Sequence, residues 1–149
     1  MHGWFVGAEI AVLIVLVLVL PLVVLALRCR WLARQGGTFE CSLRLRTSTP
    51  GAGWALGVAR YNDENLEWFR FFSYSFGPRK TFVRNEINVL DSREPDPVEA
   101  VSLYVGQRIV RIETTTGPQP EIWDVAMSGE SLTGMLSWLE AAPPGAATY

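Results

Sequence analysis

The chain has 149 residues, of which 13 are basic and 15 acidic, with one histidine and two cysteines. The lone His2 excludes a histidine-based triad or general base farther along the chain, and Cys29 and Cys41 are too few for a four-cysteine metal site or a disulfide framework. An isoelectric point near 5.4 argues against nucleic-acid binding.

The first predicted element is a transmembrane helix at residues 10–27. These 18 residues carry no charge and no hydrogen-bonding side chain. As a helix they would be about 27 Å long, close to the hydrocarbon thickness of a bilayer. A cleavable signal peptide would begin with basic residues, whereas the only charged residue before this run is Glu9. We therefore expect a retained membrane anchor.

The arginines after the apolar run predict its orientation. Arg28, Arg30 and Arg34 follow it directly, whereas residues 1–9 contain no lysine or arginine. The positive-inside rule then places residues 1–9 outside the cell and the rest of the chain on the cytoplasmic face of the inner membrane. Residues 28–37 form a basic juxtamembrane linker, and its three arginines are candidate contacts to anionic lipid headgroups.

Pro21 in the anchor and Glu9 directly before it are candidate contacts to a partner. Pro21 removes one backbone donor and predicts a kink, which is either a packing notch for another membrane helix or an ordinary feature of a span. Glu9 is either a water-exposed carboxylate at the interface or a group that takes part in partner or proton binding.

From residue 38 the pattern changes to the period-two alternation of half-buried β-strands. Phe39, Cys41 and Leu43 alternate with polar residues in the first strand, at residues 38–46. A turn cluster at residues 62–65 predicts a hairpin. The six further strands are predicted at residues 54–61, 66–75, 80–90, 98–105, 108–115 and 121–127.

One amphipathic helix follows the strands. Leu132, Met135, Leu136 and Leu139 repeat at helical spacing, and Ser128 is available as the N-cap. Two prolines at residues 143–144 would end the helix, which leaves residues 143–149 as a flexible tail. The predicted fold is a transmembrane helix followed by a mainly-β domain at residues 38–142, a seven-stranded antiparallel barrel or sandwich capped by the C-terminal α-helix.

Three segments carry a resemblance to a known family, at residues 34–38, 53–61 and 132–140. The β domain resembles the pleckstrin-homology superfold. The chain as a whole resembles an actinobacterial family of short single-span membrane proteins of unknown function, whose genes usually lie beside the ATP synthase genes. The resemblance implies a pleckstrin-homology-like domain and no established activity.

Basic residues of the domain are candidate lipid or phosphate contacts, because phosphate recognition needs several cations that converge. The loop at residues 47–53 contains no lysine or arginine, which argues against a specific inositol-phosphate pocket and leaves contact with an anionic surface. The turn at residues 78–80 resembles a Pro-x-Arg-Arg turn of the family, with lysine in place of the second arginine. The candidates in the domain are Arg44, Arg46, Arg60, Arg79, Lys80 and Arg84.

The predicted strand at residues 66–75 is aromatic on both faces. Phe69 and Phe71, with Tyr61 or Tyr74, would form an exposed patch for a protein partner if one face of the sheet is open to water. The competing interpretation is that the barrel or a helix covers them.

Together these patterns predict a noncatalytic adaptor or scaffold that presents a β domain at the cytoplasmic face for protein binding. The expected partners are the lipid bilayer and a membrane protein, and the gene neighbourhood that the resemblance implies makes a complex such as the ATP synthase a hypothesis for the latter. We expect no cofactor, nucleic acid or small-molecule substrate. The alternative is a peripheral sensor of anionic lipid headgroups, since residues 28–84 hold ten basic and four acidic residues.

Overall fold

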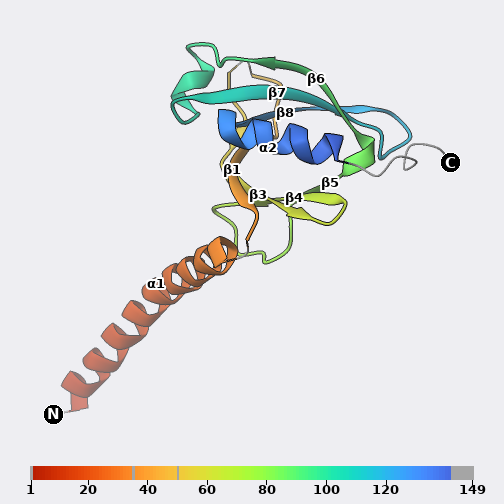
Figure 1. The fold of residues 1–149 in the computed structure, drawn as a ribbon. Coiled ribbons are helices and arrows are strands. Elements are labelled where there is room, and N and C mark those ends of the chain that lie inside the picture. Colours follow the sequence, from red (N-terminus) through yellow and green to blue (C-terminus); the bar gives the residue numbers. More distant parts are fainter. Residues whose placement is uncertain (1, 35, 50, 142–149) are drawn as a thin grey trace.

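The structure is a computed structural model that describes residues 2–34, 36–49 and 51–141 (Figure 1). The predicted tail at residues 143–149, with its two prolines, lies outside the described residues. Within them, a long helix precedes an antiparallel β domain and a second helix. The elements are α1 (His2–Arg34), β1 (Thr38–Arg44), β2 (Trp54–Ala55), β3 (Gly57–Asn62), β4 (Asn65–Arg70), β5 (Lys80–Val83), β6 (Ile87–Arg93), β7 (Gln107–Thr114), β8 (Glu121–Ser128) and α2 (Gly129–Glu140), with 3₁₀ helices η1 (Arg84–Glu86) and η2 (Glu99–Val101).

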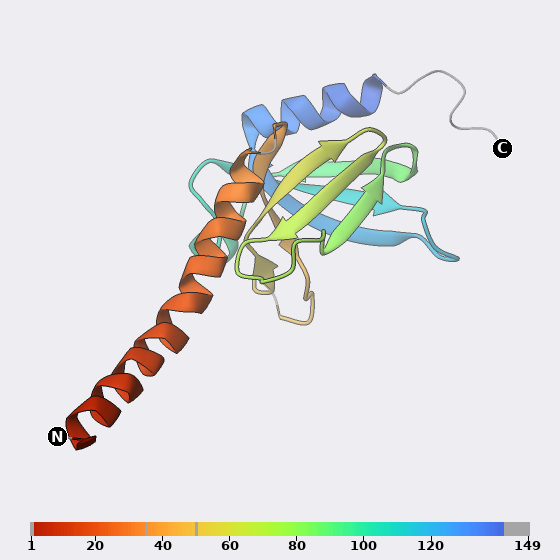
Figure 2. The ribbon, with the colours of Figure 1, turned by 90° about the horizontal axis from the view of Figure 1, so that it is seen from below.

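Helix α1 is long and apolar enough to cross a membrane. Its most apolar 18-residue stretch has a mean hydropathy of 3.5, and none of that stretch is buried against the rest of the chain. Helix α1 continues through Pro21 as a single helix, and Figures 1 and 2 draw it as one continuous coil. A proline removes only one backbone donor, so the hydrogen bonds on either side keep the helix continuous.

Strand β1 belongs to two antiparallel sheets. Its first half pairs with β3 in a sheet completed by β4 and β5, which we call the first sheet. Its second half pairs with β8 in a sheet completed by β7 and β6, the second sheet, and its end also pairs with β2. Figure 1 shows the two sheets diverging from β1, with α2 lying across the opening between them.

The strand predictions are confirmed in part. The hairpin at residues 62–65 is confirmed, because Asn62 pairs with Asn65 and Asp63 adopts a positive φ of 51° in the turn. The structure has eight strands within the described residues instead of seven. The segment at residues 54–61 divides at Leu56 into β2 and β3, and the segment at residues 66–75 ends as a strand at Arg70.

Two predicted strands are wrong for identifiable reasons. The segment at residues 80–90 breaks at η1, where the buried side chain of Arg84 turns inward, and β6 then begins in the second sheet. The segment at residues 98–105 contains η2 instead of a strand. Asp96 Oδ1 accepts hydrogen bonds from the backbone N–H groups of Val98 and Glu99, at 3.0 and 2.9 Å, and this arrangement starts a helical turn.

The C-terminal helix is confirmed with its cap. Ser128 Oγ accepts a hydrogen bond from Ser131 N at 3.2 Å, as an N-cap does. The ring of Trp138 lies 5.0 Å from that of Tyr61, so α2 contacts the first sheet as well as the second. The core that results draws buried side chains from both sheets and α2, among them Leu43, Trp68, Phe82, Ile112, Val125, Met127 and Met135.

Candidate functional site

The junction between α1 and the β domain is built around Arg28. This side chain is only 1 % exposed, its Nε lies 2.6 Å from the carbonyl oxygen of Ser75, and one terminal nitrogen lies 3.0 Å from that of Phe71. A buried guanidinium needs such partners, because an unpaired buried charge is strongly unfavourable. The prediction that Arg28 contacts lipid headgroups is therefore wrong, and Arg28 instead fastens α1 to residues 71–79, which we call the β4–β5 loop.

A small groove of about 220 Å³ separates the last turns of α1 from the first sheet. Cys29, Leu32 and Ala33 line it from the helix, and Phe71 closes the opposite side with Thr38, Phe39, Glu40 and Val58. Leu32 is buried and Trp31 packs edge-on against Phe76 at 5.7 Å between ring centroids. Helix α1 thus has a direct packing contact with the domain.

The two candidate aromatic residues take different positions at this junction. Phe69 is 1 % exposed, so the prediction that it forms an exposed partner patch is wrong. Val58, which pairs with Phe69 across the sheet, lines the groove, so Phe69 lies on the face that α1 approaches. Phe71 follows the end of β4 and is half-buried in the groove. The competing interpretation, burial under a helix or the barrel, holds for Phe69.

Four of the basic candidates contact carboxylates within the domain. Arg44 lies 3.8 Å from Glu99 and 3.6 Å from Asp124, and it donates to the carbonyl groups of Thr49 and Ala52. The other three pairs are Arg60 with Glu67, Lys80 with Glu121 and Arg84 with Glu64. Arg60 also lies over Phe69, and Arg84 over Trp138. These pairings leave little of the predicted basic surface free.

The basic candidates that are exposed are spread over three separate places. Arg30 and Arg34 lie at the end of α1, Arg46 follows β1, and Arg79 ends the β4–β5 loop. The structure does not bring them into one phosphate pocket, which would require convergent guanidinium groups.

An ion-pair cluster that the sequence did not indicate lies in the second sheet. Glu99 is 2 % exposed, and its two carboxylate oxygens accept hydrogen bonds from Arg93 at 2.6 and 2.8 Å. Asp124 accepts from Arg111 at 2.9 Å, and Arg44 lies between the two carboxylates. The hydrogen bonds from Arg93, with a further one from the backbone of Asp96, hold the pKa of Glu99 below its ordinary value.

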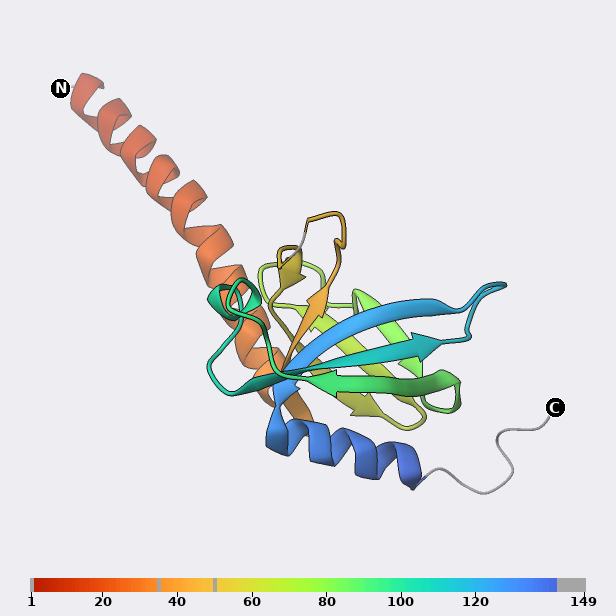
Figure 3. The ribbon, with the colours of Figure 1, turned by 90° about the horizontal axis from the view of Figure 1, so that it is seen from above.

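This cluster supports residues 94–106, which we call the β6–β7 loop. The loop exposes four apolar or aromatic side chains, those of Val98, Val101, Tyr104 and Val105. It borders a hollow of about 460 Å³ into which Gln107 and Arg108 also face. Figure 3 shows the loop at the end of the second sheet opposite the turn between β7 and β8. The sequence signal that could have indicated this ordered loop was Asp96 followed three residues later by Glu99, which is capping-box spacing.

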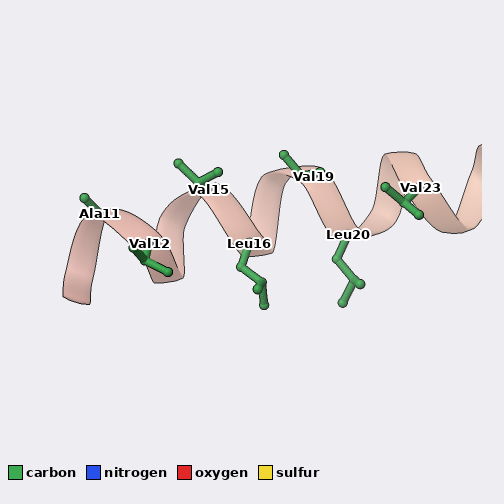
Figure 4. A pocket seen from close by; sticks show the side chains of 7 residues that line it. All are labelled: Ala11, Val12, Val15, Leu16, Val19, Leu20 and Val23. Carbon is green, nitrogen blue, oxygen red and sulfur yellow. The ribbon is translucent and has the colours of Figure 1, made fainter. Parts of the chain in front are cut away.

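The apolar surface of α1 carries a shallow hollow along one side. Figure 4 shows the side chains that line it projecting from successive turns, with no other element facing them. They are Ala11, Val12, Val15, Leu16, Val19, Leu20 and Val23. Glu9 lies beside the next hollow toward the N-terminus, with Phe5, Ala8, Val12 and Leu13. The structure brings no other element to Glu9 or Pro21 within the described residues.

Neither cysteine is in a disulfide. Cys41 is buried in β1 and Cys29 lines the groove at the junction. Burial raises the pKa of the Cys41 thiol well above its ordinary value. Among residues 2–34, 36–49 and 51–141, no three histidine, cysteine, aspartate or glutamate side chains are placed to hold a metal ion.

The fold and its surfaces define a protein with a long apolar N-terminal helix packed on an antiparallel β domain that a second helix closes. The chain belongs to the family described as "Protein of unknown function (DUF2550)", whose sequence profile matches residues 13–145. It is 33 % identical over 132 residues to the uncharacterized protein Rv1312 of Mycobacterium tuberculosis, covering 88 % of this chain and 89 % of that protein. It is 30 % identical over 138 residues to the uncharacterized protein ML1147 of Mycobacterium leprae, covering 92 % and 93 %.

Proposed function

We propose that this chain is a single-span membrane protein that acts as a noncatalytic adaptor. Its β domain, which we infer to be pleckstrin-homology-like, is presented to a protein partner at the cytoplasmic face of the inner membrane. The apolar surface of α1 supports the membrane anchor, because residues 10–27 match the bilayer in length and none of the most apolar stretch is buried. The exposed Arg30 and Arg34 support the orientation.

The observation that carries the adaptor proposal is the β6–β7 loop. Exposed apolar side chains at a loop tip are typical of protein contacts, and a loop that is already ordered loses less entropy when it binds. Here Glu99 keeps the loop ordered. Its carboxylate binds Arg93 at the end of β6 and also accepts a hydrogen bond from the backbone N–H of Asp96, so the start of the loop is held against the sheet. The loop therefore combines a contact surface with a rigid support.

The paired arginines make the lipid-sensor alternative weaker. A sensor of anionic headgroups needs cationic side chains that are available to bind phosphate, whereas Arg44, Arg60 and Arg84 already contact carboxylates of the domain. Arg30 and Arg34 would still lie near headgroups at the end of the anchor, which gives contact with an anionic surface without selecting one lipid.

The partner can be tested with a photo-reactive amino acid at Val101 in the full-length protein, in native membranes. We expect a reproducible adduct with one protein, absent when the probe is at the exposed Gln119 on the opposite turn and reduced by Val105→Asp. The gene neighbourhood implied by the family resemblance makes the ATP synthase and its assembly intermediates the first candidates for mass spectrometry. Recovery of lipid adducts alone from Val101 would contradict the adaptor proposal.

The anchor and its orientation have a separate test. Full-length protein should stay in the membrane pellet after an alkaline carbonate wash, and a reporter fused after Tyr149 should be active in the cytoplasm. Release by carbonate would contradict the anchor, and a reporter active only outside the cytoplasm would contradict the orientation.

A further inference from the structure

The β4–β5 loop exposes aromatic side chains that the core does not use. Phe72, Tyr74 and Phe76 are 76, 58 and 53 % exposed, although burial of an aromatic ring stabilises a folded protein. Of the aromatic residues just before them, Trp68 and Phe69 are buried and Phe71 is half-buried. Every second residue from Phe72 to Phe76 thus presents an aromatic ring to its surroundings.

The loop is held at a defined level along α1. Arg28 is the first residue after the apolar run at residues 10–27, and it donates to the carbonyl oxygens of Ser75 and Phe71. One turn farther on, Trp31 contacts the ring of Phe76. Figures 1 and 2 both show the chain between β4 and β5 running beside the last turns of α1. The exposed rings therefore lie level with the end of the apolar run.

The charge around the loop is of one sign. Residues 68–85 contain no aspartate or glutamate, and the exposed Arg70 and Arg79 stand at the two ends of the loop. Aromatic side chains at the headgroup level, with flanking arginines directed to phosphate, are typical of membrane interfaces. The hydrogen bonds from Arg28 also satisfy two backbone carbonyl groups of the loop, which lowers the cost of placing them at that depth.

We propose that Phe72, Tyr74 and Phe76 insert into the headgroup region of the leaflet in which the apolar run at residues 10–27 ends, so that the bilayer holds the domain at two points. This inference rests on the membrane anchor of the proposed function and adds a fixed orientation of the domain to it. With the loop inserted, the orientation that Arg28 and Trp31 give the domain relative to α1 is also fixed relative to the membrane surface.

The test is spin labelling of full-length protein in vesicles of phosphatidylcholine with some phosphatidylglycerol. The background is Cys29→Ser, in which the remaining Cys41 is buried. Labels are placed by Tyr74→Cys or, separately, Phe72→Cys, and their collisions with oxygen and with a water-soluble nickel chelate give their depth. Leu16→Cys in the span and Gln119→Cys on the β7–β8 turn are the reference positions.

We expect labels at residues 72 and 74 to collide with the nickel chelate several-fold less often than the label at residue 119, while keeping oxygen access. In the variant labelled at residue 74, Phe72→Asp should move the label toward water without changing the circular dichroism spectrum. Nickel access equal to that at residue 119, or protection from both reagents, would overturn the inference while residue 16 still reports the bilayer centre. Nickel access at residue 16 would instead contradict the anchor itself.

Discussion

Arg93 and Glu99 form a two-pronged ion pair in which each terminal guanidinium nitrogen donates to a separate carboxylate oxygen, at 2.6 and 2.8 Å. Glu99 is almost completely buried, whereas the Arg93 side chain is 37 % exposed. The pair joins the end of β6 to η2, and thereby fixes where the β6–β7 loop leaves the sheet.

This pair predicts a defined loss of stability in acid. Because Arg93 lowers the folded-state pKa of Glu99, the unfolded state binds more protons than the folded state near pH 4. The contribution of the ion pair to the free energy of unfolding is therefore complete above about pH 5, and it is lost as the pH falls through the folded-state pKa of Glu99. Glu99→Gln should reduce the free energy of unfolding at pH 7 by about 2 kcal/mol, and the difference should shrink toward pH 3. Urea unfolding in detergent at several pH values measures this. The control Glu94→Gln changes an exposed neighbour, and an equal loss there would contradict the prediction.

Removal of the Arg28 side chain should loosen the junction. Arg28→Ala eliminates two hydrogen bonds from a charged donor, which we expect to lower the free energy of unfolding of the domain by about 2 kcal/mol. Hydrogen exchange should rise in the β4–β5 loop, because the loop loses its attachment to α1. Arg30→Ala, an exposed position two residues on, should leave exchange in this loop unchanged. Equal exchange in the two variants would show that Arg28 does not position the loop.

Two glycines should respond to alanine in opposite directions. Gly53 has a φ of +87°, and a Cβ there would lie 2.2 Å from the backbone oxygen of Arg46, so Gly53→Ala should cost about 2 kcal/mol or more. Gly134 lies in α2 with open space around it, so Gly134→Ala should stabilise by about 0.5–1 kcal/mol through helix propensity. Thermal unfolding of both variants and of the parent protein measures these two changes in stability. A Gly53→Ala variant more stable than the parent would contradict the description of the turn.

Removal of the N-cap of α2 should have a smaller effect on the free energy of unfolding. Ser128→Ala removes the acceptor for Ser131 N and should destabilise by about 1 kcal/mol. Ser137→Ala, at an exposed position inside α2, serves as the matched control and should be neutral or slightly stabilising. Loss of the cap should also raise hydrogen exchange in the first turn of α2, and an unchanged first turn would argue that water replaces the cap without cost.

Features encoded by local pattern were predictable from the sequence. The apolar run, the strand segments at residues 108–115 and 121–127, the turn at residues 62–65 and the Ser128 cap depend on residues close together in the chain. The exchange of one predicted strand for η2 came from a local competition, since the carboxylate of Asp96 captured the backbone donors of Val98 and Glu99 that an extended strand would have offered to a neighbour.

The candidate site was less predictable because its contacts join distant residues. Counting charges over residues 28–84 indicated a basic surface, but Arg44 pairs with Asp124 and Arg28 binds the backbone near residue 75. Neither contact follows from spacing, because it depends on which strands become neighbours. The aromatic run at residues 68–76 was visible, yet only the packing of α1 separates the buried Phe69 from the exposed Phe72 and Tyr74.

The division of β1 between two sheets sets an order for assembly on the ribosome. Residues 38–83 contain every strand of the first sheet, so that sheet can form soon after the anchor emerges. Cys41 to Leu43 must wait for Val125 to Met127 at the far end of the chain. Until translation reaches them, the nascent protein carries an open hydrogen-bonding edge close to its anchor, and truncation before residue 121 would leave that edge permanently available to other chains.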